Sequence, residues 1–128
     1  MAQNNRIFIA FAIEDEWARD YLVGQMRNNR SPFTWTDMSV KNPWANDWRN
    51  QCRSRIRGCD GMIAIVSTNT PRANGQLFEI KTAAEEGVPL MAMHAKQYDR
   101  LYLMPSELSG VHVYDWTWDN ISWFLNRL

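Results

Sequence analysis

Residues 62–67 read Met-Ile-Ala-Ile-Val-Ser, and this short apolar run decides the fold class. Its apolar residues follow one another without alternation, which predicts a strand covered on both faces, as in a parallel sheet. Similar runs at 6–12 and 88–93 predict two more buried strands. The aromatic and β-branched residues at 33–36 predict a short strand, and those at 111–114 predict a short strand at an edge of the sheet.

Helical segments separate these strands. The first is expected from the acidic residues 14–16 to just before Pro32, the second over 46–57, the third between the polar loop 68–74 and Gly87, and the last over 117–127. Their predicted apolar stripes are, in order, Trp17, Ala18, Tyr21 and Leu22; Trp48, Cys52 and Ile56; Leu77, Ile80 and Ala84; and Trp118, Ile121, Phe124, Leu125 and Leu128.

Alternating strands and helices predict an α/β protein. Five strands fit a flavodoxin-like three-layer sandwich, with a five-stranded parallel sheet of order 2-1-3-4-5 and helices on both faces. A length of 128 residues fits a single domain over 1–128.

Composition excludes several classes of protein. Lys+Arg and Asp+Glu both number 14, so no net charge attracts nucleic acid or an anionic membrane. The N-terminal residues lack a signal-peptide pattern and the longest apolar run is too short to span a bilayer, so we expect a cytoplasmic protein with no nucleic-acid or membrane partner. Neither the two cysteines nor the two histidines have metal-ligand spacing, and we expect no metal site. Seven tryptophans predict an aromatic core or an adhesive surface.

Ligands of such sheets bind at the carboxyl ends of the strands, near the switch point between the first and third strands. This rule selects residues 10–14, 37–44 and 67–79. Among them, Glu79 follows the loop that leaves the central strand and lies at the edge of a predicted buried stripe. A partly buried carboxylate there can stabilise an oxocarbenium ion or attack an anomeric carbon. Alternatively, Glu79 only complements the positive end of the helix dipole.

Two other interpretations of charged residues are weaker. The acidic residues 14–16 suggest a response-regulator receiver, but Ser67 stands where the phosphoacceptor Asp is needed and Tyr114 where a Lys is needed. A basic stripe on the second helix suggests phosphate or nucleic-acid binding, whereas the zero net charge favours a solvated face or a subunit contact. The stripe consists of Arg49, Arg53 and Arg57.

Four segments resemble Toll/interleukin-1 receptor (TIR) domains, including the bacterial NAD⁺-cleaving signalling proteins. They are the strand Arg6–Phe11; the segment Asp37-Met38-Ser39; the stretch Ile56–Ser67, which runs from a helix end into the third strand; and Gly75–Ile80, which resembles the segment that carries the family's catalytic Glu. The resemblance covers about residues 6 to 95 and rests on the order and spacing of these motifs.

The resemblance implies an NAD⁺ glycohydrolase or cyclase that cleaves the nicotinamide–ribose bond in bacterial antiphage immunity. Its product would be an ADP-ribose derivative, cyclic in some members. Glu79 would be the catalytic residue, and NAD⁺ would be the substrate, with no cofactor. Phe11 and Trp44 would contact a ring of the substrate, and Ser67 and Asn69 its ribose or phosphates. The expected substrate-binding set is completed by Ala10, Asp37 and Ser39.

The resemblance also implies partners and leaves alternatives. Copies of the chain would self-associate through TIR–TIR contacts, and a separate effector protein would sense the product. Ala10 and Gly75 differ from the residues common in catalytic members and favour a non-catalytic interaction module. Residues 78–80, with 83–84 and 87–90, are also similar to nucleoside 2-deoxyribosyltransferases.

Overall fold

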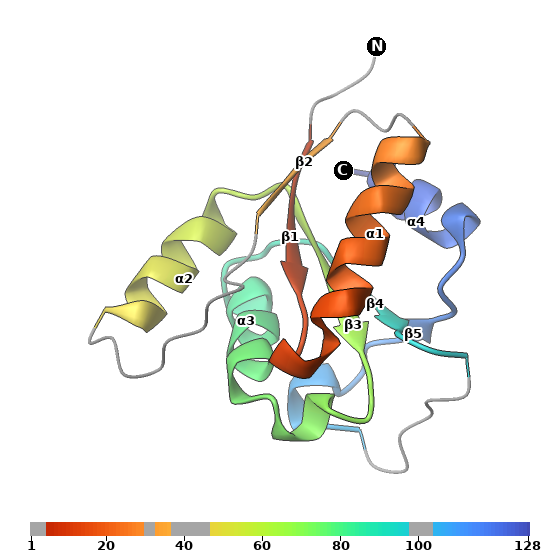
Figure 1. Ribbon diagram of the computed structural model, residues 1–128. Helices are drawn as coiled ribbons and strands as arrows, with labels where there is room; N and C mark the ends of the chain where they lie inside the picture. Colours follow the sequence, from red (N-terminus) through yellow and green to blue (C-terminus); the bar gives the residue numbers. More distant parts are fainter. Residues whose placement is uncertain (1–4, 30–32, 37–46, 98–103) are drawn as a thin grey trace.

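The computed structural model describes residues 5–29, 33–36, 47–97 and 104–128. Strands and helices alternate along the chain (Figure 1): β1 (Asn5–Ala10), α1 (Glu16–Asn28), β2 (Phe33–Thr36), α2 (Trp48–Arg57), β3 (Gly61–Val66), α3 (Asn74–Glu85), β4 (Leu90–His94), β5 (Val113–Tyr114) and α4 (Trp118–Leu125). Short 3-10 helices lie at η1 (Ile13–Asp15), η2 (Thr70–Arg72) and η3 (Ser106–Leu108).

The five strands form one parallel sheet in the order β2-β1-β3-β4-β5, which confirms the predicted topology. The strand β3 is central, and all six of its residues are buried. Its Ala64 pairs with Ala10 of β1 and with Ala92 of β4. Because all strands run in one direction, their carboxyl ends meet at a single edge of the sheet.

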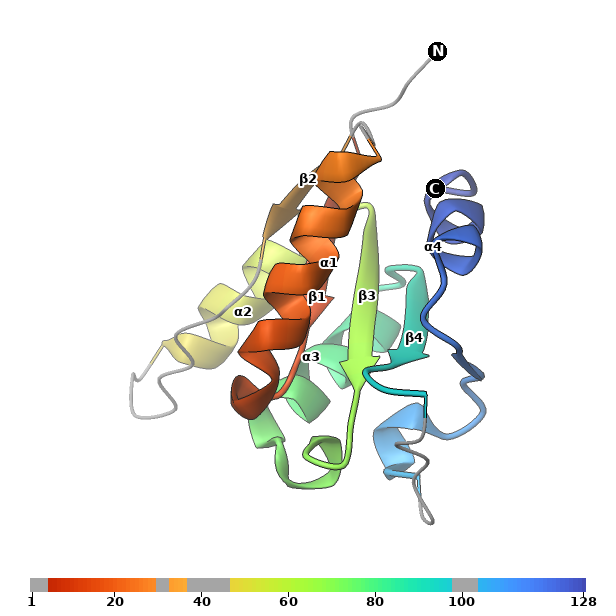
Figure 2. The same cartoon turned by 45° about the vertical axis from the view of Figure 1, so that its right-hand side comes forward.

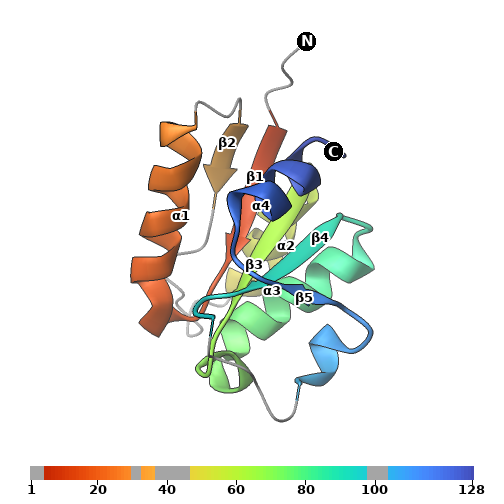
Figure 3. The ribbon, with the colours of Figure 1, turned by 90° about the vertical axis from the view of Figure 1, so that its right-hand side faces the viewer.

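Two apolar cores cover the two faces of the sheet. Successive strand residues point to opposite faces, so Ile63 and Ile65 pack with α1 and α4, whereas Met62, Ala64 and Val66 pack with α2 and α3. Figure 3 shows α4 in front of the sheet and α2 and α3 behind it. The three-layer architecture predicted from the sequence is therefore confirmed.

Two helices present faces other than those predicted. In α1, Trp17 and Tyr21 are 48% and 64% exposed, while Ala18 and Leu22 are buried. Arg19 takes a buried place in that helix, with its guanidinium 5.3 Å from the centre of the Phe11 ring.

The face that α3 turns toward the sheet differs from the predicted apolar stripe, and this difference brings polar side chains to the candidate site. Ala84 is exposed and Leu77 is only half-buried, although both were expected to pack inward. Gln76 and Glu79 are buried instead, together with Ile80. The helix therefore turns two polar side chains toward the sheet.

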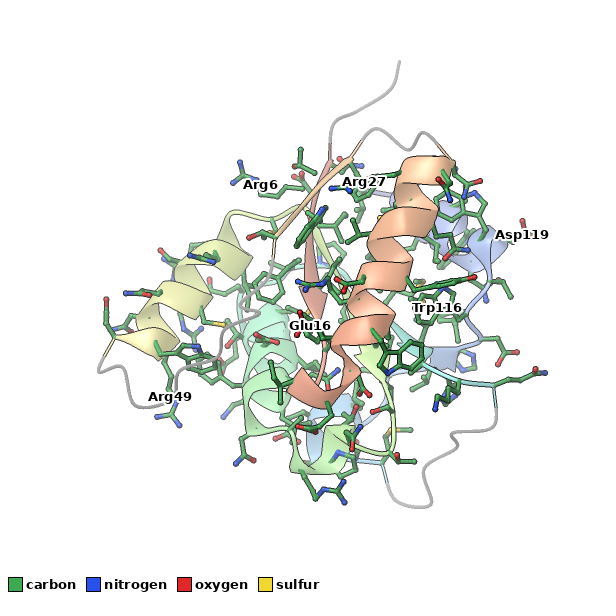
Figure 4. All side chains as sticks on the ribbon, in the orientation of Figure 1. Arg6, Glu16, Arg27, Arg49, Trp116 and Asp119 are labelled. Atoms are coloured by element: carbon green, nitrogen blue, oxygen red, sulfur yellow. The ribbon has the colours of Figure 1, made fainter. Side chains whose placement is uncertain are left out.

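The basic stripe of α2 binds the neighbouring helix. Arg53 donates to Glu85 and Glu86 at 2.9 and 3.0 Å, and Arg57 donates to Glu86 at 3.0 and 3.1 Å. Figure 4 shows Arg49 on the side of the molecule opposite Trp116. This contact within the chain was not among the predicted alternatives, and it accounts for two of the three arginines.

Exposed aromatic side chains gather around α1, β5 and α4. The rings of Tyr21 and Trp116 meet edge to face with their centres 5.5 Å apart, and the rings of Tyr114 and Trp123 lie 6.0 Å apart. The side chains of Trp17 and Trp123 are each about half exposed.

Within the described residues, no helix is both long enough and apolar enough to cross a membrane.

Candidate functional site

The candidate site lies at the carboxyl ends of β1 and β3. Figure 2 shows the arrowhead of β3 leading into the loop and η2 that precede α3. The helix α3 contacts β1, β3 and β4. Three connections therefore meet at this edge: β1 to η1, β3 to η2, and η2 to α3.

Gln76 joins α3 to both central strands. Its Nε2 donates to the carbonyl oxygen of Ala10 in β1 at 3.1 Å and to that of Ile65 in β3 at 2.7 Å. The side chain is 0% exposed. Buried carbonyl groups need hydrogen-bond donors, and this single amide supplies one to each of the two carbonyl oxygens. An apolar residue at position 76 could not do so.

Asp15 lies at the centre of a second buried group of hydrogen bonds. The hydroxyl of Ser67 and the Nδ2 of Asn69 both donate to its carboxylate, the latter at 3.0 Å. The amide of Ser67 donates to the hydroxyl of Thr70 at 2.9 Å, and Arg72 donates to Asn69 Oδ1 at 3.2 Å. Although Asp15 follows β1, its side chain thus holds the loop after β3 in place.

Glu79 is the sixth residue of α3, three positions after Gln76. Its side chain is 0% exposed. Glutamate is rarely buried to this degree in folded proteins, and buried carboxylates concentrate at functional sites. The sequence predicted a carboxylate at the edge of a buried stripe, whereas the structure places Glu79 within the buried face of the helix.

The other predicted site residues fall into three groups. Ala10 and Phe11 are fully buried at the end of β1. Ser67 is buried and Asn69 is half-buried, and both donate to Asp15. Three predicted residues lie outside the described residues: Asp37, Ser39 and Trp44. The substrate contacts expected of all seven residues stay predictions.

Sequence reasoning missed the structural importance of Asp15 and Gln76. Asp15 was grouped with the acidic residues that begin the first helix, yet it is 3% exposed. Gln76 lies outside the apolar stripe predicted for the third helix, yet it is 0% exposed. The available signal was position, because both residues lie in the loops and helix start that follow β1 and β3.

Ion pairs join α2 to the C-terminal end of α3, the end away from Gln76. Hydrogen bonds from Arg57 and Arg53 lower the pKa of Glu86 to about 2. Just after the end of α2, burial raises the pKa of the Cys59 thiol to about 11, which makes it a poor nucleophile at neutral pH. Neither cysteine forms a disulfide bond. Across the part of the chain that the structure describes, no three His, Cys, Asp or Glu side chains are grouped to hold a metal ion.

Comparison with solved structures places this architecture among known folds. Superposition on the TIR domain of the Toll-related receptor TRR-2 from Hydra magnipapillata gives a TM-score of 0.65, covering 94% of this chain and 97% of that domain at 17% sequence identity. The chain has a TIR-like fold. A prokaryotic SEFIR domain is also similar, with a TM-score of 0.55 over 97% of this chain and 89% of that one, at 10% identity.

The TIR-like fold is evident in structure rather than in sequence. No family profile matches the chain, and no curated protein sequence is significantly similar to it. At identities of 17% and 10%, the two structural neighbours establish the architecture alone. Function must therefore be argued from the side chains at the carboxyl edge of the sheet.

Proposed function

We propose that this TIR-like chain cleaves the nicotinamide–ribose bond of NAD⁺, with Glu79 as the catalytic carboxylate. The observation that carries the proposal is a fully buried glutamate on the helix that begins beside the carboxyl ends of β1 and β3. Open α/β sheets bind their ligands at this edge. A carboxylate of low exposure is suited to stabilising positive charge, because water screens it weakly.

The proposed reaction begins when the bond between C1′ of the ribose and the pyridinium nitrogen breaks. The bonding electrons leave with that nitrogen, so nicotinamide departs neutral and positive charge develops on the ribose. Glu79 stabilises this oxocarbenium-like transition state. In hydrolysis, water then adds to C1′ and releases a proton, which gives ADP-ribose. In cyclisation, a nitrogen of the substrate's own adenine takes the place of water.

The burial of Glu79 sets a condition on the proposal. NAD⁺ can approach the carboxylate only after side chains that cover it move. We propose that self-association of the chain favours this opening, so that turnover per molecule rises with protein concentration. The ADP-ribose product would then act on a separate effector protein, as the resemblance to bacterial antiphage TIR proteins implies.

The test compares nicotinamide release from NAD⁺ by the wild type and Glu79→Gln at high protein concentration. We expect the variant to be slower by about 10²- to 10³-fold, the usual effect of removing one electrostatic stabiliser of a transition state. Glu85→Gln is the matched control, since it makes the same change at an exposed position of the same helix. Equal rates for the wild type and Glu79→Gln would exclude Glu79 from the reaction. A mass spectrum of the products distinguishes linear from cyclic ADP-ribose.

A non-catalytic interaction module is the second candidate function, and Ala10 and Gly75, which differ from the residues common in catalytic members, favour it. Such a module would not bind the substrate at the carboxyl edge. A thermal shift with NAD⁺ or ADP-ribose separates the two candidates, because an adaptor should show no change in melting temperature.

A further inference from the structure

We infer that Gln76 is a positioning residue that holds Glu79 in place through the two central strands. This inference rests on the proposed function and extends it to a residue that does not touch the reacting atoms. Its basis is the pair of hydrogen bonds from one buried amide to the carbonyl groups of Ala10 and Ile65.

The start of α3 lacks the usual means of fixing a helix end. Ala73 is the N-cap residue and supplies no side-chain hydrogen bond to the first turn. In the described structure, Gln76 links this turn to β1 and β3. A helix end without a side-chain cap frays more readily, so the amide of Gln76 limits how far the first turn can move.

Gln76 and Glu79 are close neighbours on one side of α3. Side chains three positions apart in a helix lie on the same side, one turn apart, and both are fully buried. A displacement of the first turn therefore moves Glu79 with it. An error of about 1 Å in the position of a catalytic group can reduce the rate by about 10²-fold, so the restraint has a direct effect on chemistry.

The amide of Gln76 also has a defined orientation. Because Nε2 donates to both carbonyl groups, Oε1 is directed away from them. This Oε1 is buried and, among the described residues, receives no hydrogen bond. Substitution by methionine tests the donor function of the amide. Methionine keeps the length and flexibility of the side chain but has no N–H donor.

The test is Gln76→Met, compared with Ile121→Val, which alters the core on the opposite face of the sheet. The first readout is the titration of the Glu79 carboxyl carbon by NMR in selectively labelled protein, with Glu79→Gln to assign the signal. We expect the pKa of Glu79 in Gln76→Met to differ from the wild-type value by about 0.5 or more, and the control to leave it unchanged. A general loss of stability would not move this value.

The second readout is the turnover of NAD⁺. We expect kcat to fall by about 10- to 100-fold in Gln76→Met, with KM changed less than about threefold, because the carboxylate acts in the transition state. An unchanged Glu79 pKa together with a kcat equal to that of the control would overturn the inference. If the wild type releases no nicotinamide, the proposed function fails, and the NMR titration alone decides whether Gln76 positions Glu79.

Discussion

At the scale of one residue, Asp15 shows how the loops at the carboxyl ends of β1 and β3 are held together. Its carboxylate accepts hydrogen bonds from Ser67 and Asn69, which belong to the loop after another strand. A hydrogen bond to a charged group contributes more than one between neutral groups. Asp15 therefore connects the ends of β1 and β3, as Gln76 does through the carbonyl groups of Ala10 and Ile65.

We expect Asp15→Ala to lower the free energy of unfolding by about 2 kcal/mol, because it leaves the buried hydroxyl of Ser67 and the half-buried amide of Asn69 without their acceptor. The double variant with Ser67→Ala should lose about 1 kcal/mol less than the sum of the single changes, since the two side chains share one interaction. Urea denaturation measures these values.

The control for this cycle combines Asp15→Ala with Glu86→Gln, at the far end of α3. These two changes should add to within about 0.5 kcal/mol. Equal additivity in both pairs would contradict a specific coupling between Asp15 and Ser67.

The residues at the sheet edge mark the limit of prediction from sequence. Apolar periodicity placed Leu77 and Ala84 inward, yet Gln76 and Glu79 are buried. The strand ends present carbonyl groups that need donors, and at Ala10 and Ile65 a polar side chain supplies one. That requirement arises from tertiary packing and leaves no periodic signal in the sequence of α3.

At the scale of elements, the strands were predictable because each is a short apolar run. The strand β3 has a strand on each side and helices on both faces, so none of its residues faces water. Apolar and polar residues therefore do not alternate along it. The strand β5 is only Val113–Tyr114, shorter than the expected 111–114, and it pairs with β4 alone. The predictions within residues 37–44 concern a segment outside the described residues.

The contact between α2 and α3 predicts how stability depends on acid. The folded protein holds the pKa of Glu86 near 2, against an ordinary value of 4.5. The stabilisation is therefore fully present above about pH 4.5 and is lost as the pH falls toward 2. As the pH falls through this interval, we expect the free energy of unfolding to decrease less in Glu86→Gln than in the wild type.

Urea midpoints at pH 6, 4 and 3 would measure the effect. Glu14→Gln, which changes an exposed glutamate outside the α2–α3 contact, is the control and should follow the wild type. An identical pH dependence in the wild type and Glu86→Gln would show that the arginines do not favour the charged form of Glu86.

At the scale of the whole molecule, the natural candidate for contact with another copy of the chain is the aromatic face, defined by the exposed side chains Trp17, Tyr21 and Trp123. Trp17 and Trp123 expose about half of their surfaces, and each lies beside a cation, Lys96 and Arg127 respectively. Tryptophan is enriched in the energetically important centres of protein interfaces.

We expect the double variant Trp17→Gln/Trp123→Gln to weaken self-association about tenfold or more, as the loss of interface hot spots does. Its melting temperature should change little, because both side chains are half exposed. Sedimentation velocity over a range of concentrations measures the association. Arg49→Gln, at a position on the side of the molecule opposite Trp116, is the control (Figure 4). An unchanged dissociation constant in the tryptophan variant would remove this face from the contact.

The contact between α2 and α3 combines two kinds of interaction. The rings of Trp48 and Phe78 meet with their centres 5.4 Å apart, whereas Arg53 and Arg57 pair with glutamates at the C-terminal end of α3. Dissolved electrolyte screens the ion pairs and hardly touches the rings. A concentrated buffer should therefore loosen the C-terminal end of α3 while the ring contact still holds this helix against α2.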